Sequence, residues 1–135
     1  MVLGVGVDVV EVERIQTAIT RFGDRFLRRV YLPNEIAYCQ SFKHSMPHFA
    51  ARFAAKEAIS KAFGTGIGRD LGWLDMEIQR HPSGAPFVVL HGDARQLLVA
   101  RQAADVLISL SHTRQHAVAT ALLMAGNAPF LQKPQ

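Results

Sequence analysis

The sequence predicts an α+β domain with a largely antiparallel sheet and one long packed helix. Residues 2–10 alternate between apolar and small or polar side chains, which is the period of a strand. Residues 48–63 form a long helical pattern that ends at a glycine. Residues 106–111 and 117–124 are two further strand patterns separated by a short connection, and such neighbours pair as an antiparallel hairpin.

The N-terminal strand has two different faces. One face carries Leu3, Val5, Val7 and Val9, and the other carries Gly4, Gly6 and Asp8. We expect the glycines to leave room beside Asp8 for a ligand that approaches the backbone. The alternative is an acid at a strand end that faces solvent or accepts a hydrogen bond from a nearby amide.

The other segments complete one domain over residues 1–125. Their patterns predict a helical region at 12–30 interrupted near Gly23, a helix at 35–42 capped by Asn34, strands at 74–79 and 87–90, a helix from Asp93 to about residue 103, and a frayed tail at 126–135.

The composition favours an acidic partner and a reducing compartment. The chain has 135 residues and a net charge of +4, with a pI near 9.7, and its 11 arginines outnumber its 4 lysines. Arginine suits bidentate contacts to phosphate and carboxylate groups. The single Cys39 excludes an internal disulfide and a cysteine-rich zinc site. The best candidate for a membrane segment, 117–125, is shorter than the roughly 20 residues that span a bilayer, so we expect a cytoplasmic protein without a membrane segment.

The long helix combines charged residues with an otherwise apolar surface. Glu57 and Lys61 lie four residues apart, as in an ordinary surface ion pair. The surrounding alanines and phenylalanines instead indicate a buried helix, in which charges need strong partners. Arg52, Lys56 and Ser60 form an adjacent stripe of groups that can bind phosphate.

Gly64, Gly66 and Gly68 follow this helix rather than precede one. They therefore do not form a Walker or dinucleotide-binding loop, in which the phosphate lies at a helix N-terminus. Two interpretations stay open: a helix cap followed by a turn, or a loop whose backbone amides approach a phosphate.

Two further groups of polar residues have candidate roles. Ser109, Ser111 and His112 cluster at a strand end without the pattern of a hydrolase triad, so they are either ligand-binding groups or turn residues. Four arginines are spaced to share one helical face, which favours an acidic partner over a merely solvated surface. They are Arg14, Arg21, Arg25 and Arg28.

Taken in order, these motifs resemble the holo-acyl-carrier-protein synthase family, the small stand-alone class of 4′-phosphopantetheinyl transferases. The resemblance covers roughly residues 2–125. It is carried by Gly6-Val-Asp8, Arg52-Phe-Ala-Ala-Lys56-Glu57-Ala, Lys61-Ala-Phe-Gly64-Thr-Gly66, Gly84-x-Pro86 and Ser109-x-Ser111-His112.

The resemblance implies transfer of 4′-phosphopantetheine from coenzyme A to a serine of an acidic acyl carrier protein, with release of adenosine 3′,5′-bisphosphate. It also implies a magnesium ion, for which manganese is an alternative, and a homotrimer with active sites at subunit interfaces. Asp8, Glu57 and Lys61 are the implied catalytic residues, and Asp8 and Glu57 the metal ligands. The predicted cofactor-binding set is Arg52, Lys56, Ser60, Gly64, Gly66, Pro86, Ser111 and His112, and the docking set is Arg14, Arg21, Arg25 and Arg28.

The two-domain relatives have a further acid two positions after the first, where this chain has Val10. We therefore expect two protein ligands for the metal. The base that accepts the serine proton is either Glu57 or a water held by Asp8. A basic nucleic-acid-binding module and another metal-dependent phosphoryl-transfer enzyme are the alternative functions. The predicted strands at 2–10 and 106–111 lack the aromatic residues that the nucleic-acid alternative requires, and we expect no nucleic-acid partner.

Overall fold

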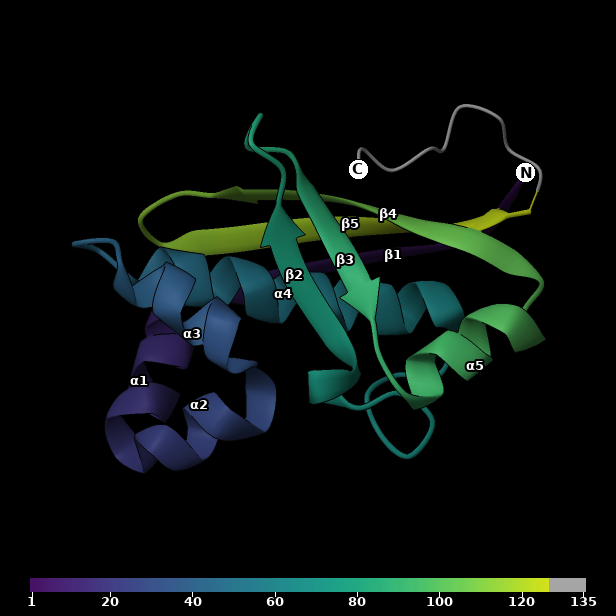
Figure 1. Ribbon diagram of the computed structural model, residues 1–135. Helices are drawn as coiled ribbons and strands as arrows, with labels where there is room; N and C mark the ends of the chain where they lie inside the picture. Colours follow the sequence, from purple (N-terminus) through teal and green to yellow (C-terminus); the bar gives the residue numbers. More distant parts are fainter. Residues whose placement is uncertain (127–135) are drawn as a thin grey trace.

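The computed structural model describes residues 1–126, so most of the predicted C-terminal tail lies outside the described residues. Figure 1 shows the arrangement of the elements. Along the chain they are β1 (Val2–Glu11), α1 (Val12–Phe22), α2 (Asp24–Val30), α3 (Pro33–Gln40), α4 (Met46–Phe63), a 3₁₀ helix (Trp73–Asp75), β2 (Met76–Arg80), β3 (Pro86–Leu90), α5 (Asp93–Ala100), β4 (Ala103–His112) and β5 (His116–Ala125).

The strands form two antiparallel sheets, which confirms the predicted fold class. The larger sheet has the order β1-β5-β4, and β2 pairs with β3 in a separate hairpin. Helix α4 runs along one face of the larger sheet, whereas no helix covers the opposite face in the view of Figure 1. Helices α1 to α3 gather at one end of α4, and α5 lies at the other end.

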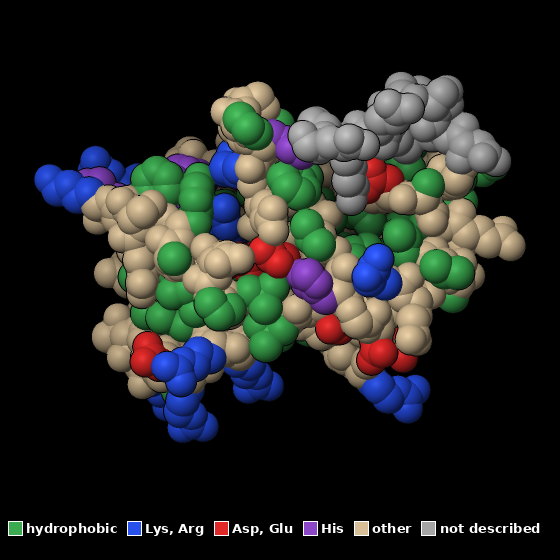
Figure 2. Space-filling model, in the orientation of Figure 1, with side chains coloured by type: hydrophobic (Ala, Val, Ile, Leu, Met, Phe, Trp, Pro, Cys, Tyr) green, Lys and Arg blue, Asp and Glu red, His purple; other side chains and the backbone are tan. Residues whose placement is uncertain are grey.

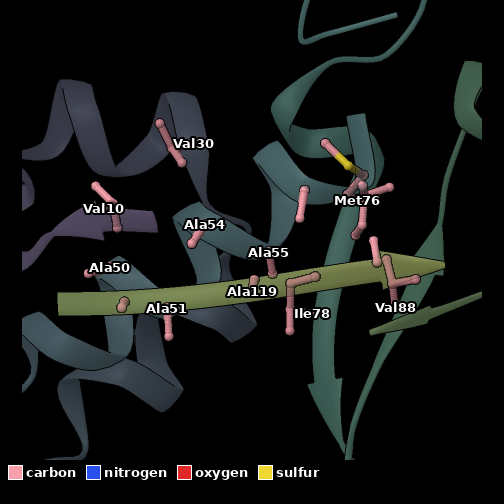
Figure 3. Packing of buried hydrophobic residues seen from close by; sticks show 14 of the residues in the cluster. Val10, Val30, Ala50, Ala51, Ala54, Ala55, Met76, Ile78, Val88 and Ala119 are labelled. Atoms are coloured by element: carbon pink, nitrogen blue, oxygen red, sulfur yellow. The ribbon is translucent and has the colours of Figure 1, made fainter. Parts of the chain in front are cut away.

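Small residues let α4 lie close to the sheet. Figure 3 shows Ala50, Ala51, Ala54 and Ala55 of α4 beside Ala119 of β5. All five residues are buried. Because alanine side chains are short, the backbones of the helix and the strands approach each other closely, and the position of α4 relative to β1 and β5 is tightly defined.

Several predicted helix ends differ in detail. Helix α4 ends at Gly64, which has the positive φ of 81° that favours glycine at this position, as predicted. The predicted caps Asn34 and Asp93 are wrong, because α3 and α5 begin after Leu32 and Gly92 instead. At α3 the Glu35 carboxylate accepts a hydrogen bond from the Leu32 amide at 2.9 Å, which gives a partner to a backbone amide at the start of the helix.

The uncovered face of the larger sheet is apolar along β1. Val5, Val7 and Val9 of β1 are 64%, 52% and 63% exposed, respectively. A continuous exposed valine stripe is typical of a surface that another protein covers. None of the helices at 1–126 is long and apolar enough to cross a bilayer.

Candidate active site

The seam between β1 and α4 brings three predicted site residues together. Lys61 Nζ lies 3.2 Å from Asp8 Oδ1 and donates a second hydrogen bond to the Val7 carbonyl at 3.0 Å. The Lys61 side chain is 51% exposed and that of Asp8 is 16% exposed. Lys61 is therefore paired with an acid 53 residues away and not, as the helical spacing suggested, with Glu57.

Glu57 lies in the electrostatic field of the same cluster. Burial raises the pKa of its carboxyl, and the negative charge of Asp8 raises it further, whereas Lys61 and Arg14 lower it. Two carboxylates that destabilise each other's charge are stabilised by a divalent cation, and such a pair suits Mg²⁺, which keeps water and phosphate oxygens as its other ligands. The donor set thus fits the implied ion, and residues 1–126 contain no cluster of three or more His, Cys, Asp or Glu residues placed to hold a metal.

Gly4 and Gly6 of β1 make room for helix α4 and not, as predicted, for a ligand. A Cβ atom at Gly4 would lie 2.0 Å from the Ala62 carbonyl oxygen, and one at Gly6 would lie 1.8 Å from that of Ala58. The backbone that approaches the strand is therefore helix α4, and the expectation that these glycines leave room for a ligand is wrong. By admitting the helix, they bring Asp8 next to Glu57 and Lys61.

Lys56 faces the interior, which contradicts its prediction as a phosphate ligand. Its side chain is fully buried, and Nζ donates to Glu35 Oε1 at 2.7 Å, to the Val30 carbonyl at 2.6 Å and to the Trp73 carbonyl at 3.1 Å. All three ammonium protons are therefore used within the chain. Burial lowers the pKa of Lys56, while the Glu35 carboxylate raises it in part.

The Ser60 hydroxyl and the amides of the glycine loop also form hydrogen bonds within helix α4 and its C-terminal cap. Ser60 is buried, and its hydroxyl donates to the Glu57 carbonyl at 2.7 Å. The amides of Gly64, Thr65 and Gly66 all donate to the Ser60 carbonyl, at 3.1, 3.2 and 3.2 Å. This hydrogen bonding supports the helix-cap interpretation and contradicts the prediction that these amides are available to a phosphate.

Arg52 differs from Lys56 although both are buried. Its guanidinium lies 4.0 Å from the centre of the Tyr38 ring. The Nε and Nη1 atoms have no hydrogen-bond partner among residues 1–126. Buried donors without acceptors are costly, and an anion is the partner that a guanidinium binds most strongly. Arg52 therefore keeps its place as a candidate ligand contact.

A basic pocket of about 790 Å³ contains the predicted His112 together with basic residues that sequence reasoning missed. Its rim joins the start of α4, the segment before it and the β4–β5 turn. His48 contacts His112 at 4.9 Å and stacks on Phe42 at 3.7 Å between ring centres. Short basic clusters around Pro47 and His112 in the sequence could have pointed to it. The positively charged or titratable residues that line this basic pocket are Lys43, His44, His48, His112 and Arg114.

The predicted Ser111–His112 corner is divided between two faces of β4. His112 lies on the α4 side, where it contacts His48. Ser111 pairs with Val118 in the sheet and, by alternation, faces the exposed side with Val9. Pro86 begins β3 and is not part of the basic pocket. Within one chain these three residues therefore do not form a single site.

The four predicted docking arginines occupy two helices rather than one face. The helical conformation is interrupted at Gly23, where φ is 56°. Arg14 and Arg21 therefore belong to α1, and Arg25 and Arg28 belong to α2. All four are exposed, and Figure 2 shows Lys and Arg side chains gathered over α1 and α2. Arg14 is close enough to Glu57 to lower the pKa of that carboxyl, which places it at the edge of the acidic pair.

Comparison with known proteins agrees with the motifs and the geometry. The sequence profile of the 4′-phosphopantetheinyl transferase superfamily matches residues 4–121. The chain belongs to this superfamily. It is 51% identical over 123 residues to the holo-[acyl-carrier-protein] synthase of Koribacter versatilis, with 91% of this chain and 98% of the relative covered.

Solved structures of phosphopantetheinyl transferases share the fold. The holo-[acyl-carrier-protein] synthase of Neisseria meningitidis superimposes with a TM-score of 0.85 at 28% identity, over 91% of this chain and 98% of the other. The synthase of Helicobacter pylori in complex with coenzyme A gives a TM-score of 0.77 at 34% identity, over 88% and 98% of the two chains.

Proposed function

We propose that this protein transfers 4′-phosphopantetheine from coenzyme A to a serine of an apo acyl carrier protein and releases adenosine 3′,5′-bisphosphate. One observation carries the proposal: Asp8 of β1 meets Glu57 and Lys61 of α4, which are distant from it in sequence, at one seam of a phosphopantetheinyl-transferase fold. Two acids and a cation in contact with solvent are what phosphoryl transfer from a pyrophosphate requires, because the reaction is limited by positioning and charge stabilisation.

Asp8 and Glu57 would hold the magnesium ion. When bound, this ion would neutralise negative charge on the pyrophosphate. Lys61 is half exposed and tied to Asp8 only at the surface, so its ammonium can turn toward the departing bisphosphate. The serine oxygen forms the new bond to the β-phosphorus as the bond to the bisphosphate oxygen breaks. The serine proton passes to one of the two bases that the acidic pair offers, the Glu57 carboxylate or a water held by Asp8.

The basic pocket and Arg52 would take the phosphates of the nucleotide end of coenzyme A. Five basic side chains line the pocket, and no acid is among its lining residues. Arg52 contributes two donors that have no partner within residues 1–126. Arg14, next to the acidic pair, and the arginines of α1 and α2 would bind the acidic surface of the carrier protein.

We further propose that the complete active site needs more than one copy of the chain. Asp8 and Glu57 do not line the basic pocket of their own chain, and the exposed valine face of β1 offers an apolar surface for self-association. A homotrimer is the expected arrangement. Light scattering of the purified protein should give the mass of three chains, and Val7→Lys should reduce it. A wild-type monomer that is fully active would contradict this part.

Intact-mass analysis of an apo acyl carrier protein tests the function itself. Incubation with this protein, coenzyme A and Mg²⁺ should add one phosphopantetheinyl unit, and EDTA should abolish the gain. No gain across several carrier proteins would reject the proposal. Pyrophosphate cleavage without a carrier would then favour another phosphoryl-transfer enzyme. Location in the cytoplasm stays a prediction.

A further inference from the structure

Glu35 and Lys56 form a buried hub that the transfer chemistry does not use. The side chains of both residues are fully buried and 2.7 Å apart. Glu35 Oε1 also accepts the Leu32 amide at 2.9 Å, and Oε2 accepts the Ile78 amide at 3.0 Å. Together with the Lys56 bonds to the carbonyls of Val30 and Trp73, both charged groups are fully hydrogen-bonded.

Stability alone does not explain a buried ion pair. Removing two charges from water opposes their attraction, and apolar replacements of similar size are often equally stable or more stable. A pair that is retained in the core can instead select one arrangement of the elements around it, since each bond has a required direction. The role of the hub therefore depends on which elements its hydrogen bonds hold together.

The hub joins the three elements that surround the Arg52 guanidinium, one of the candidate nucleotide-binding groups. Helix α3 carries Glu35 and also Tyr38, whose ring lies 4.0 Å from the Arg52 guanidinium. Strand β2 donates a hydrogen bond from the Ile78 amide to Glu35 and carries Arg80, which lies 6.0 Å from the same ring. Helix α4 carries Lys56 together with Arg52.

The acidic pair is fixed by other contacts. Asp8 and Glu57 meet because Gly4 and Gly6 of β1 lie against the backbone of α4. The hub bonds involve α3 and the residue before it, the last residue of α2, α4, the first residue of the 3₁₀ helix and β2, and none of its partners is on β1. A change in the hub can therefore move Tyr38, Arg52 and Arg80 relative to one another without separating Asp8 from Glu57.

We propose that Glu35 and Lys56 are positioning residues for the nucleotide end of coenzyme A. They fix α3 and β2 against α4 and thereby place the Arg52 guanidinium for the substrate phosphates. This inference rests on the proposed function, since it assigns coenzyme A to the groups around Arg52. It separates substrate recognition, which depends on the hub, from metal binding and chemistry, which depend on the β1–α4 seam.

The double variant Glu35→Leu/Lys56→Met tests this assignment, because it removes both charges and leaves neither unpaired. We expect it to unfold cooperatively at a lower temperature than the wild type, because the amides of Leu32 and Ile78 lose their acceptor, while the KM for coenzyme A rises about tenfold. The kcat, the KM for the carrier protein and the affinity for Mn²⁺ should not change, which is the pattern of lost substrate binding. Val106→Ala, a buried truncation on β4 outside the hub, should leave the KM for coenzyme A unaltered.

A stable double variant with the wild-type KM for coenzyme A would overturn the proposal, and so would an equal rise in Val106→Ala. If the double variant gives no cooperative unfolding transition, Glu35→Gln takes its place. It keeps a carbonyl acceptor but loses the charge, and it should raise the KM for coenzyme A with kcat retained. A Glu35→Gln protein with the wild-type KM would overturn the proposal. Failure of the wild type to modify any carrier protein would reject the proposed function instead.

Discussion

Helix α4 is held on two sides by opposite physical means. Toward β1 it is held by close contact of backbones, with Gly4 and Gly6 against the carbonyls of Ala62 and Ala58 and no buried charge at the contact. Toward α3 and β2 it is held by Lys56 and its fully hydrogen-bonded partner Glu35. The first contact depends on the absence of side-chain atoms, and the second depends on charged side chains that have every partner they need.

The difference separates two kinds of sensitivity. The contact of Gly4 and Gly6 with α4, here called the glycine seam, should tolerate no added side-chain atom, because the neighbouring atoms belong to the backbone of a packed helix. The hub should tolerate the loss of both charges better than the loss of one, because a single buried charge keeps its desolvation penalty without its partner. Mutations on the two sides of α4 can therefore be compared directly.

Lys56→Met should cause the largest loss of stability. It leaves the Glu35 carboxylate buried without its ion partner, and we expect the free energy of unfolding to fall by about 3–5 kcal/mol. Addition of Glu35→Leu should restore part of that loss, because it removes the unpaired charge but leaves the amides of Leu32 and Ile78 without their acceptor. Urea unfolding of the two variants and the wild type measures both changes. A double variant less stable than Lys56→Met would show that the hub stabilises the fold beyond its charge pairing.

Gly6→Ala should have the next largest effect. The added methyl group would lie 1.8 Å from the Ala58 carbonyl oxygen, so β1 and α4 must move apart. We expect a loss of roughly 3 kcal/mol together with reduced kcat, since Asp8 moves away from Glu57. Gly68→Ala is the matched control, because nothing lies within 4 Å of an added Cβ there. Equal stability of the two variants would contradict the close seam.

The sequence was sufficient for the elements and for the residues that meet at the seam, but not for the orientation of α4. Alternation correctly predicted the strand with Val5 on one face and Asp8 on the other. Periodicity also placed Arg52, Lys56 and Ser60 on one stripe. It could not show that this stripe faces the core, because alanines surround the helix on every side and give no apolar contrast.

Long-range pairing explains the remaining differences. Lys61 pairs with Asp8 and Lys56 with Glu35, over separations of 53 and 21 residues. Local spacing favoured Glu57 as the partner of Lys61, since only neighbours on one helix can be judged without the fold. The basic pocket was missed for the same reason, because His48 and His112 meet only after α4 packs on the sheet.

Arg14→Glu should have a moderate effect on carrier recognition. Arg14 is exposed beside the acidic pair, so we expect the KM for an acidic carrier protein to rise roughly tenfold, while the KM for coenzyme A is unchanged. Arg28→Glu on α2 provides the comparison across the break at Gly23. A larger effect at Arg28 than at Arg14 would move the docking surface to α2.

His48→Gln should have the smallest effect, which appears only in the pH dependence of stability. Burial and the neighbouring His112 lower the pKa of His48 below its ordinary value of 6.5. The unfolded chain therefore binds more protons than the folded chain between the two pKa values, and stability falls as pH drops below about 6.5. The melting temperature of His48→Gln should fall less between pH 7.5 and pH 5, at roughly constant ionic strength, than that of the wild type. His116→Gln, an exposed histidine, should behave like the wild type.

Cation binding is the most direct test of the central claim that the glycine seam assembles a two-carboxylate metal site. Free Mn²⁺ can be followed by electron paramagnetic resonance with adenosine 3′,5′-bisphosphate present, in the wild type, Asp8→Asn and Glu57→Gln. We expect one Mn²⁺ per chain in the wild type and an affinity for Mn²⁺ at least about tenfold lower in each variant. Wild-type affinity in either variant would show that the cation is held elsewhere.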